Sequence, residues 1–320
     1  MFKLVLDMMG GDNGVKATIA AVSKFLENVK DCEIIAVGDE KELESLKGKV
    51  TIVPSQSVVP MECSVMQAMR QKDSSVFKAV SAVNEMKADG VISAGSTGAF
   101  LSLTTLINKK IPGVERPALI TPFPCKNGKY VVLLDVGASA ENKPEDMVQF
   151  AKMGSEYAKA VYGTKQPIVR LICNGTEEGK GNNFSKDSYA LLKGTPGFAG
   201  YVEGRDAFSG ETDVVVMDGF TGNIMLKTAE GMAKMMGSMM KKSFTSSFSA
   251  KMGYLLSKKG FKPMLDTMNY KKVGGALLLG VNTIAVKAHG NSDEESFLAS
   301  MMVAYNLIKN GVVEKIKKNL

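Results

Sequence analysis

The sequence predicts an α/β fold in which helices cover both faces of a mostly parallel sheet. Short apolar runs alternate with segments that carry apolar residues three and four positions apart, from the start of the chain to its end. Strands of a parallel sheet are buried on both faces and therefore read as continuous apolar runs, and helices connect them. The 320 residues, 45% of them apolar, are enough for a sizeable core.

The elements follow one another along the chain. Apolar runs predict strands at residues 3–6, 34–37, 50–53, 91–93, 118–121, 131–134, 168–173 and 214–217. Helical spacing predicts helices between them, among them residues 16–29, 75–87, 145–162 and 293–309. No fixed-period repeat, low-complexity segment or Pro- or Ser-rich linker marks a boundary, so we expect residues 1–320 to form a single α/β domain.

Residues 224–265 interrupt this alternation, because they contain no strand signal. Methionine, phenylalanine and leucine recur there at helical spacing and predict a helical hairpin that breaks near residues 246–253. One interpretation is that the hairpin packs on the sheet or on a second subunit; the other is that its tip, where apolar residues mix with lysines, lies on an anionic membrane. Both can hold, with the stem in a dimer interface and the tip on lipid. The candidate contact residues are Phe248, Lys251, Leu255, Leu256, Lys258, Lys259 and Lys262.

Glycine-rich polar turns follow four of the predicted strands. They occupy residues 7–14 (DMMGGDNG), 93–99 (SAGSTGA), 135–139 (DVGAS) and 218–223 (DGFTGN). Glycine lets a backbone approach an anion closely, and a helix that begins at such a turn directs unpaired N–H groups towards it. Each turn alone is also typical of an ordinary tight connection, but four of them favour a shared crevice that binds an anion.

Composition excludes several classes of protein. The four cysteines are far apart and His289 is the only histidine, so we expect no metal site and reduced cysteines, as in the cytoplasm. The chain starts with a strand and has no apolar run of membrane-spanning length. Its net charge is +7, with lysines gathered between residues 241 and 272, which suggests an acidic partner. We do not expect nucleic acid, because the chain lacks tryptophan and any recognisable stacking platform or DNA-binding motif.

The common nucleotide and nucleophile motifs do not fit this chain. Its glycine turns lack the GxGxxG spacing of a dinucleotide site, and GTEEGKGN at residues 175–182 has three residues where a P-loop has four. A catalytic triad would need His289, and no GxSxG-type turn accompanies it. We therefore expect no cofactor and no covalent enzyme intermediate.

A set of sequence blocks covers essentially the whole chain in an order that resembles one family. The blocks are DMMGGDNG, MRQKDSS, SAGSTGA, DVGAS, NGTEEGKGN, GYVEGRD, DVVVMDGFTGNIMLK, GGALLLGV and KAHGNS. They resemble the acyl-acyl-carrier-protein:phosphate acyltransferases of bacterial phospholipid synthesis, the PlsX family. The chain departs from the family's pattern at Asn13, where histidine is frequent, and at Ser96 and Ser139, where asparagine is frequent.

This resemblance implies a three-layer α/β/α fold like that of phosphotransacetylase and isopropylmalate dehydrogenase, a homodimer, and a reaction without a cofactor. Long-chain acyl-acyl carrier protein and inorganic phosphate would give acyl phosphate, which a membrane glycerol-3-phosphate acyltransferase would use for phosphatidic acid. The protein would be cytoplasmic and attached peripherally to the inner face of the cell membrane. Acyl carrier protein is acidic, so the lysines of residues 251–272 would attract it.

The candidate site residues follow from this chemistry, in which phosphate is the nucleophile and a thiolate leaves without a strong catalytic base. The phosphate pocket would consist of Gly10, Gly11, Asp12, Gly95, Ser96, Thr97 and Gly98, with Arg70 and Lys180 supplying positive charge. Asn223 and the amides around Thr221 and Gly222 would bind the oxyanion. Asp7, Asp135 and Asp218 would orient neighbours or lysines, and His289 would donate a proton to the departing sulfur. Alternatively, Arg70 and Lys180 form surface ion pairs and His289 makes a structural hydrogen bond.

Two other functions stay open at this point. One is a coenzyme A-dependent enzyme similar to phosphotransacetylase, although the long apolar hairpin favours a long-chain substrate. The other is a non-catalytic anion-binding scaffold on the same fold, which would bind phosphate and turn over no thioester.

Overall fold

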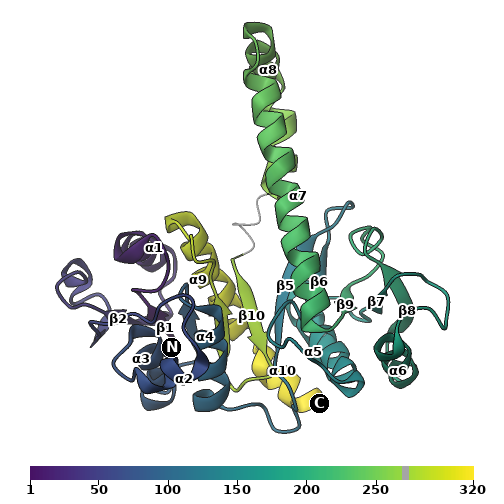
Figure 1. The fold of residues 1–320 in the computed structure, drawn as a ribbon. Coiled ribbons are helices and arrows are strands. Elements are labelled where there is room, and N and C mark those ends of the chain that lie inside the picture. The colour runs from purple at the N-terminus through teal and green to yellow at the C-terminus, as the bar shows by residue number, and fades with distance from the viewer. Residues whose placement is uncertain (269–273) are drawn as a thin grey trace.

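A sheet of eleven strands runs through the described part of the molecule (Figure 1). The computed structural model describes residues 1–268 and 274–320, with the side chains of all of these except residues 262–268. The strand order is β3-β2-β1-β4-β11-β10-β5-β6-β9-β7-β8, and buried apolar clusters lie on both faces of the sheet. These features confirm the predicted α/β class, whereas the division into domains stays a prediction.

The sheet consists of two parallel halves. In the first half, the strands are β3 (Thr51–Pro54), β2 (Cys32–Gly38), β1 (Phe2–Asp7), β4 (Gly90–Ser93) and β11 (Ile284–Lys287). In the second half, they are β6 (Tyr130–Leu134), β9 (Val214–Val216), β7 (Val169–Cys173) and β8 (Phe198–Glu203). Apolar runs rich in Val, Ile and Leu account for most of these strands, as expected for strands buried on both faces.

Two strands in the middle of the sheet reverse its direction. β10 (Ala276–Leu279) is antiparallel to both β11 and β5 (Ala118–Pro124), and β5 is antiparallel to β6. After these successive antiparallel pairings, the two parallel halves run in opposite directions. The turns after β1 and β4 therefore lie at one edge of the sheet and the turns after β6 and β9 at the other. The four glycine turns do not share one edge, contrary to the simplest form of the shared crevice.

The helices divide between the two faces of the sheet according to the alternation of its buried side chains. Leu4 and Leu6 of β1 belong to the cluster that includes Phe25 of α1 and Phe297 of α9, whereas Val5 belongs to the opposite cluster with α3 and α4. The helices are α1 (Gly14–Asn28), α2 (Val65–Arg70), α3 (Ser75–Glu85), α4 (Thr97–Leu103), α5 (Pro144–Tyr162), α6 (Asn183–Leu192), α7 (Gly219–Thr245), α8 (Phe248–Met268), α9 (Glu294–Lys309) and α10 (Val312–Asn319), with a 3-10 turn η1 (Glu44–Leu46) and a π-helical turn η2 (Thr104–Asn108).

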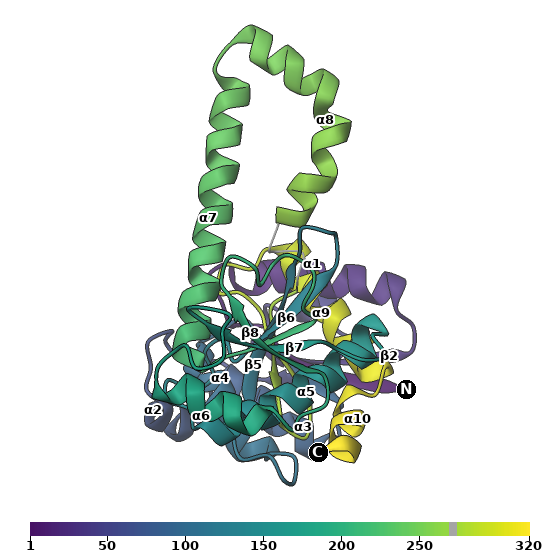
Figure 2. The same ribbon diagram turned by 90° about the vertical axis from the view of Figure 1, so that its right-hand side faces the viewer.

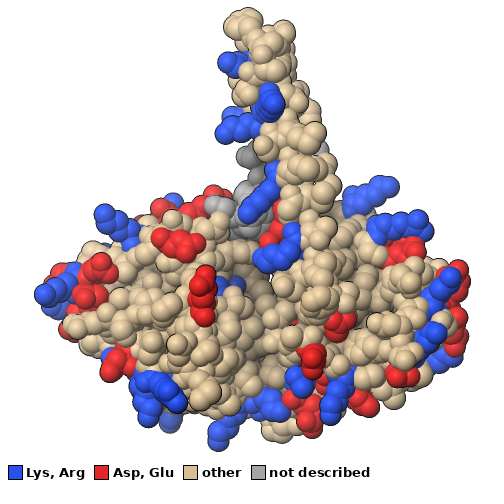
Figure 3. All heavy atoms as spheres, viewed as in Figure 1, with Lys and Arg blue, Asp and Glu red and all other residues tan. Residues whose placement is uncertain are grey.

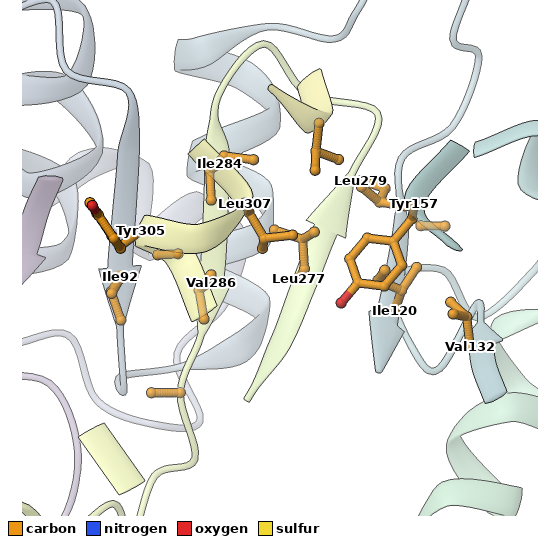
Figure 4. Packing of buried hydrophobic residues seen from close by; sticks show 14 of the residues in the cluster. Ile92, Ile120, Val132, Tyr157, Leu277, Leu279, Ile284, Val286, Tyr305 and Leu307 are labelled. Carbon is orange, nitrogen blue, oxygen red and sulfur yellow. The ribbon is translucent and has the colours of Figure 1, made fainter. Parts of the chain in front are cut away.

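The apolar layer on the α1 and α9 face joins the two halves of the sheet. Figure 4 shows Leu277 of β10 next to Leu307 of α9, with Ile92 of β4 and Val286 of β11 on one side and Tyr157 of α5 on the other. These residues are buried, and each such side chain contributes roughly 1.5–3 kcal/mol through removal from water. The strands that reverse direction are therefore held in one core with the parallel strands on either side.

Helices α7 and α8 project from the body as a hairpin (Figures 1 and 2). The break falls at residues 246–247, inside the predicted interval, and α7 begins at Gly219, earlier than the predicted start at 224. The Phe244 ring lies 4.8 Å from that of Tyr254 and 5.1 Å from that of Phe261, so an aromatic cluster joins the two helices. Among the residues that the structure describes, none of the helices combines the length and the apolar character needed to cross a membrane.

The sequence prediction missed three strands, β8, β10 and β11. The last two are short apolar runs, ALLL and IAVK, that follow the hairpin. Their omission matters because β10 takes part in the reversal of the sheet and Lys287 lies at the end of β11.

Candidate active site

Three polar side chains lie side by side at the carboxyl ends of neighbouring strands. Asp7 of β1, Ser93 of β4 and Lys287 of β11 are in register, and all three are buried. The residue before each belongs to the apolar layer on the α1 and α9 face, so these three point to the opposite face. The Ser93 hydroxyl donates a hydrogen bond to Asp7 Oδ2 at 2.6 Å. Strand register thus builds a buried row that contains one carboxylate and one ammonium.

The loops that follow these three strands pack closely on one another. A Cβ on Gly10 would lie 2.6 Å from the Gly95 nitrogen, and a Cβ on Gly11 would lie 2.8 Å from the Gly290 carbonyl oxygen. The Asp12 N–H donates to that same oxygen at 2.7 Å. Gly11 also has a φ of +98°, which favours glycine. The predicted phosphate residues of turns 7–14 and 93–99 therefore form one backbone unit with residues 289–290.

Two positions that depart from the family's pattern make local structural bonds. The Asn13 amide donates to the carbonyl oxygens of Asn291 and Ser292, at 3.0 Å each. The Ser96 hydroxyl accepts a hydrogen bond from the Ala99 N–H at 3.5 Å and caps α4. Asn13 thus joins the loop after β1 to residues 291–292, and Ser96 stabilises the first turn of α4.

Asp135 organises the turn after β6. Its Oδ1 accepts hydrogen bonds from the N–H groups of Leu119, Gly137 and Ala138 at 2.8–3.0 Å, and its Oδ2 accepts one from Ser139 at 3.0 Å. Burial raises the pKa of Asp135, and these backbone donors oppose that rise. The carboxylate is thus occupied by the chain itself, which fits the orienting role predicted for it.

Asp218 is the N-cap of α7. Its Oδ1 accepts the Thr221 N–H at 2.9 Å, its Oδ2 accepts the Thr221 hydroxyl at 2.6 Å, and its carbonyl oxygen accepts the Gly222 N–H at 2.9 Å. The amides of Thr221 and Gly222, predicted to bind an oxyanion, therefore already have acceptors within the chain. The side chain of Asn223, which is exposed, is the remaining candidate of that turn.

A cavity of about 1060 Å³ lies between α7 and the sheet. Thr97, Asn223 and His289, three of the predicted site residues, line it together with Gly137 and Gly290. Its apolar wall consists of Leu119, Pro122, Phe123, Pro124, Val136, Phe208, Met225, Leu226, Met232 and Met236. Because α7 begins at one edge of the sheet and extends past the loops of the other, it brings residues from opposite edges into one cavity. The cavity therefore joins residues from three of the four glycine turns, and a helix rather than a common strand edge assembles it; the turn of residues 7–14 contributes none of its lining residues.

The two cations predicted from the sequence do not line this cavity. Arg70, at the end of α2, and Lys180, in the loop after β7, are both exposed. The Lys180 N–H donates to the Glu177 carbonyl oxygen within its own loop. Their role at the phosphate stays a prediction without a contact to support it.

The structure adds a lysine that the sequence analysis did not consider. Lys287 lines the cavity and is 8% exposed. Burial lowers the pKa of its ammonium to about 8, and the negative charges of Asp7 and Asp12 oppose that change. Predicting β11 as a strand, or considering the lysine of the KAHGNS block, could have identified Lys287 from the sequence.

The two other titratable groups of the site are shifted by burial. Burial lowers the pKa of His289, the Glu230 carboxylate opposes this, and Lys287 and Lys227 reinforce it, so the imidazole is neutral at neutral pH. Burial raises the pKa of Asp7, against hydrogen bonds from Ser93 and the loop. On α7, Lys227 Nζ lies 2.9 Å from Glu230 Oε2, and both residues line the cavity.

A second cavity, of about 910 Å³, contains none of the predicted site residues. It is lined by Leu101 and Thr105, among others, and by Arg116, whose Nε lies 3.8 Å from Asp146 Oδ2. Three cationic and three anionic side chains line it, Lys110, Arg116, Lys143, Glu115, Glu145 and Asp146. This balance of charge gives it no preference for an anion, so we place the site in the first cavity.

The hairpin tip exposes apolar side chains, as predicted. Phe248 is 81% exposed and Leu256 is 83% exposed, with Leu255 beside them. Figure 3 shows lysines along the side of the hairpin and a largely uncharged far end. Lys251, Lys258 and Lys259 are exposed on α8, whereas the side chain of Lys262 and all of Lys271 and Lys272 lie outside the described residues.

Comparison with known proteins gives a consistent result. A family model described as "Fatty acid synthesis protein" matches residues 2–315. A phosphate acyltransferase of Thermodesulfovibrio yellowstonii is 39% identical over 100% of this chain and 94% of its own length, and one of Exiguobacterium sibiricum is 43% identical over 98% and 97%. Among solved structures, a phosphotransacetylase from Streptococcus pyogenes superposes with a TM-score of 0.61 at 16% identity, covering 98% of this chain and 94% of its own. That likeness concerns the fold.

Proposed function

The chain belongs to the fatty acid synthesis protein family and is an acyltransferase of the phosphate acyltransferase kind, and from this premise we propose that it transfers a long-chain acyl group from acyl-acyl carrier protein to inorganic phosphate. The products are acyl phosphate and the free carrier thiol. The observation that carries the proposal is the cavity between α7 and the sheet, where Thr97, Asn223 and His289 meet an apolar wall. An acyl thioester needs both surfaces, an apolar one for its chain and hydrogen-bond donors for its reacting carbonyl.

The proposed reaction needs no covalent enzyme intermediate. A phosphate oxygen attacks the thioester carbonyl carbon, and the electron pair of the C=O bond moves to the carbonyl oxygen. The oxyanion's electron pair then reforms the C=O bond as the C–S bond breaks, and the thiolate leaves with the electrons of the C–S bond and takes up a proton from water. A thiol has a pKa of roughly 8.5, so its thiolate is a good leaving group without a strong acid. The site's task is therefore to position two anions and to stabilise the oxyanion.

Three side chains of the cavity suit these tasks. The Asn223 amide donates to the carbonyl oxygen as charge develops there. The Thr97 hydroxyl donates to phosphate. His289, neutral at neutral pH, donates its ring N–H near the departing sulfur and is a poor source of a cationic acid.

The buried carboxylates act as positioning groups in this proposal. Asp7 fixes the loops that contain Gly10 and Gly95, Asp135 fixes the turn beside Asn223, and Asp218 starts α7. Asp12, Gly11, Ser96 and Gly98 complete the phosphate side of the site through their loops. Arg70 and Lys180 do not line the cavity, so the positive charge proposed for them stays a prediction.

The basic hairpin is the feature that supports acyl carrier protein as the acyl donor. Lys251, Lys258 and Lys259 are exposed on α8 and are not ion-paired within the described residues. Such a surface attracts an acidic protein, and the attraction weakens as salt screens it. A coenzyme A-dependent reaction, of the kind that the phosphotransacetylase fold also supports, is the second candidate.

The hairpin also supports a homodimer and attachment to a membrane. An apolar stripe on α7, formed by Phe220, Ile224, Met235 and Met239, is exposed along the stem, and a second subunit would cover it. The exposed Phe248, Leu255 and Leu256 at the tip suit the apolar boundary of an anionic membrane, with the lysines at its headgroups. We place the protein in the cytoplasm, on the inner face of the membrane, where a glycerol-3-phosphate acyltransferase takes up the acyl phosphate.

The test compares two acyl donors in the same assay. Purified protein is mixed with inorganic phosphate and either palmitoyl-acyl carrier protein or palmitoyl-coenzyme A, and loss of the thioester is followed. We expect phosphate-dependent consumption of the carrier-bound donor. Turnover of coenzyme A alone would move the proposal to the second candidate, and phosphate binding without any turnover would identify a scaffold.

A further inference from the structure

Lys287 is a buried cation with little compensation from the protein. It ends β11, lies in register with Ser93 of β4 and is 8% exposed, yet it lines the cavity between α7 and the sheet. Its Nζ donates to the Ala288 carbonyl oxygen. Within residues 1–261 and 274–320, no carboxylate lies within 4.0 Å of this ammonium in an ion pair. An ammonium has three donors, so the described residues leave part of its hydrogen-bonding capacity unused.

The other lysines of the cavity differ from Lys287. Lys126 and Lys227 line it as well, but both are exposed, and Lys227 is paired with Glu230. A solvated lysine gains little when an anion approaches, because water already satisfies it. A buried, unpaired ammonium is unfavourable by itself, and an incoming anion compensates it at low dielectric. Among the three lysines that line the cavity, Lys287 is thus the one that a bound anion would stabilise most.

The charges around Lys287 come from three elements. Asp7 of β1 and Asp12 of the following loop act to keep it protonated, whereas Lys227 of α7 acts in the opposite direction. Burial lowers the pKa of Lys287 to about 8, so it is charged at neutral pH. Asp7 is itself buried and bonded to Ser93 and the Gly10 N–H, which keeps its carboxylate engaged with the loop.

We propose that Lys287 binds the phosphate that attacks the thioester, on the side of the cavity that Thr97 and Gly290 line. That the bound anion is a substrate rests on the proposed function. That Lys287 forms an anion site does not depend on it. Phosphate at Lys287 has Thr97, Asn223 and His289 on the same cavity wall, beside the position where the oxyanion forms. The positive charge of the Lys287 ammonium offsets the repulsion between phosphate and that oxyanion. Arg70 and Lys180 do not line the cavity in this structure.

The experiment uses the full chain and three variants. Lys287→Met keeps the length of the side chain and removes its charge, Lys287→Arg keeps the charge, and Lys126→Met removes an exposed lysine of the same cavity as a matched control. Two quantities are measured: the binding of inorganic phosphate by calorimetry without acyl donor, and the KM for phosphate and for palmitoyl-acyl carrier protein. Circular dichroism establishes that each variant is folded.

A charge-assisted hydrogen bond in a buried site corresponds to roughly a 10- to 100-fold change in affinity. We therefore expect Lys287→Met to weaken phosphate binding and to raise the KM for phosphate by that factor, with the donor KM unchanged. Lys287→Arg should recover part of the binding, and Lys126→Met should stay near wild type. If Lys287→Met fails to fold, the Lys287→Gln variant is measured in its place.

The outcomes separate this inference from the proposed function. Phosphate affinity in Lys287→Met within about threefold of wild type, or no phosphate binding by the wild type, overturns the inference, since an intact buried-cation site predicts at least tenfold. Phosphate binding that depends on Lys287 in a protein without turnover supports the anion site and rejects the acyl-transfer reaction. Turnover with a phosphate KM insensitive to Lys287 supports the reaction and rejects the site.

Discussion

Gly222 of α7 lies against the carbonyl oxygen of Asp135, so closely that a Cβ on Gly222 would be 1.8 Å from that oxygen. The contact fixes the first turn of α7 on the turn after β6, and Gly219 approaches the carbonyl oxygen of Ser139 in the same way. Asn223 follows directly and packs beside Gly137. The position of the proposed oxyanion donor therefore depends on two glycines that allow the backbones to meet.

Replacing Gly222 by alanine should damage both stability and activity. The added methyl group forces α7 away from Asp135, and such overpacking costs about 1–3 kcal/mol or more. Gly231, further along α7, has open space at its Cβ position and is the matched control. Gly231→Ala should raise the free energy of unfolding by about 0.5–1 kcal/mol, because alanine favours the helix. Urea unfolding measures both; equal stabilities of the two variants would show that the contact does not constrain α7.

Replacing Lys287 by methionine should stabilise the protein while impairing phosphate binding. The folded-state pKa of about 8 lies below the ordinary 10.5, so between these values the unfolded chain binds more protons and stability rises with pH. Below pH 8 the full cost of the buried charge is present, and its removal should raise the free energy of unfolding by about 1–3 kcal/mol.

This gain should shrink towards zero as the pH rises through about 10, since the wild-type lysine is then neutral in the folded state. Urea unfolding at pH 7 and pH 10 in phosphate-free buffer makes the comparison, because bound phosphate would stabilise the wild type alone. A loss of stability of the same size at both pH values would mean that Lys287 contributes through packing and not as an unpaired charge.

Filling the apolar wall of the cavity should shorten the acyl chain that the enzyme accepts. Ala233 lines the cavity on α7, and Ala233→Phe places a ring where we expect the chain to lie. We expect kcat/KM for palmitoyl-acyl carrier protein to fall by about tenfold or more, the loss of a few buried methylene groups at roughly 0.8 kcal/mol each. The value for octanoyl-acyl carrier protein should change little. Met240→Phe, at a half-buried position of the same helix outside the cavity and outside the exposed stripe, is the control.

An equal effect of Ala233→Phe on both donors would place the acyl chain elsewhere. An equal effect of Met240→Phe and Ala233→Phe would indicate that the substitutions act through the hairpin as a whole.

Polar substitutions at the hairpin tip should separate membrane binding from catalysis. Phe248→Ser with Leu256→Ser removes two exposed apolar side chains, and we expect about tenfold weaker binding to phosphatidylglycerol vesicles with unchanged turnover in solution. Leu191→Ser, at an exposed leucine of α6, is the control for loss of surface hydrophobicity. Vesicle flotation measures the binding. Undiminished flotation of the tip variant would show that the tip does not contribute to membrane binding.

Charge reversal at Lys258 and Lys259 tests the second role of the hairpin. If these lysines attract the carrier protein, the donor KM rises and the rise is smaller at high salt. If only vesicle binding changes, their role is at the membrane and the carrier docks elsewhere.

The sequence predicted most of the fold because buried strands and amphipathic helices leave local patterns. The runs at residues 131–134 and 214–217 became β6 and β9, and the hairpin broke inside the predicted interval. Strand direction leaves no such pattern, so the reversal at β5 and β10 was not foreseen. The site was therefore expected at one sheet edge, whereas α7 assembles it from two.

The candidate site was predicted only in part, because strand register and burial leave no local pattern in the sequence. Thr97, Asn223 and His289 were identified from glycine turns and the single histidine, and the cavity brings them together. Lys287 was missed because its importance comes from register with Ser93 and from burial, neither of which is visible in one dimension. Arg70 and Lys180 were chosen for their positive charge within two of the family's sequence blocks; both are exposed and outside the cavity lining, so their role stays a prediction.

The most direct test of the account is detection of acyl phosphate itself. Wild-type protein is incubated with palmitoyl-acyl carrier protein and inorganic phosphate, hydroxylamine traps the product, and the hydroxamate is quantified against a reaction without phosphate. The account predicts hydroxamate in amounts equal to the thiol released, dependent on phosphate and strongly reduced in Asn223→Ala. Thiol release that proceeds equally without phosphate, or phosphate binding with no hydroxamate, would contradict the proposed acyl transfer.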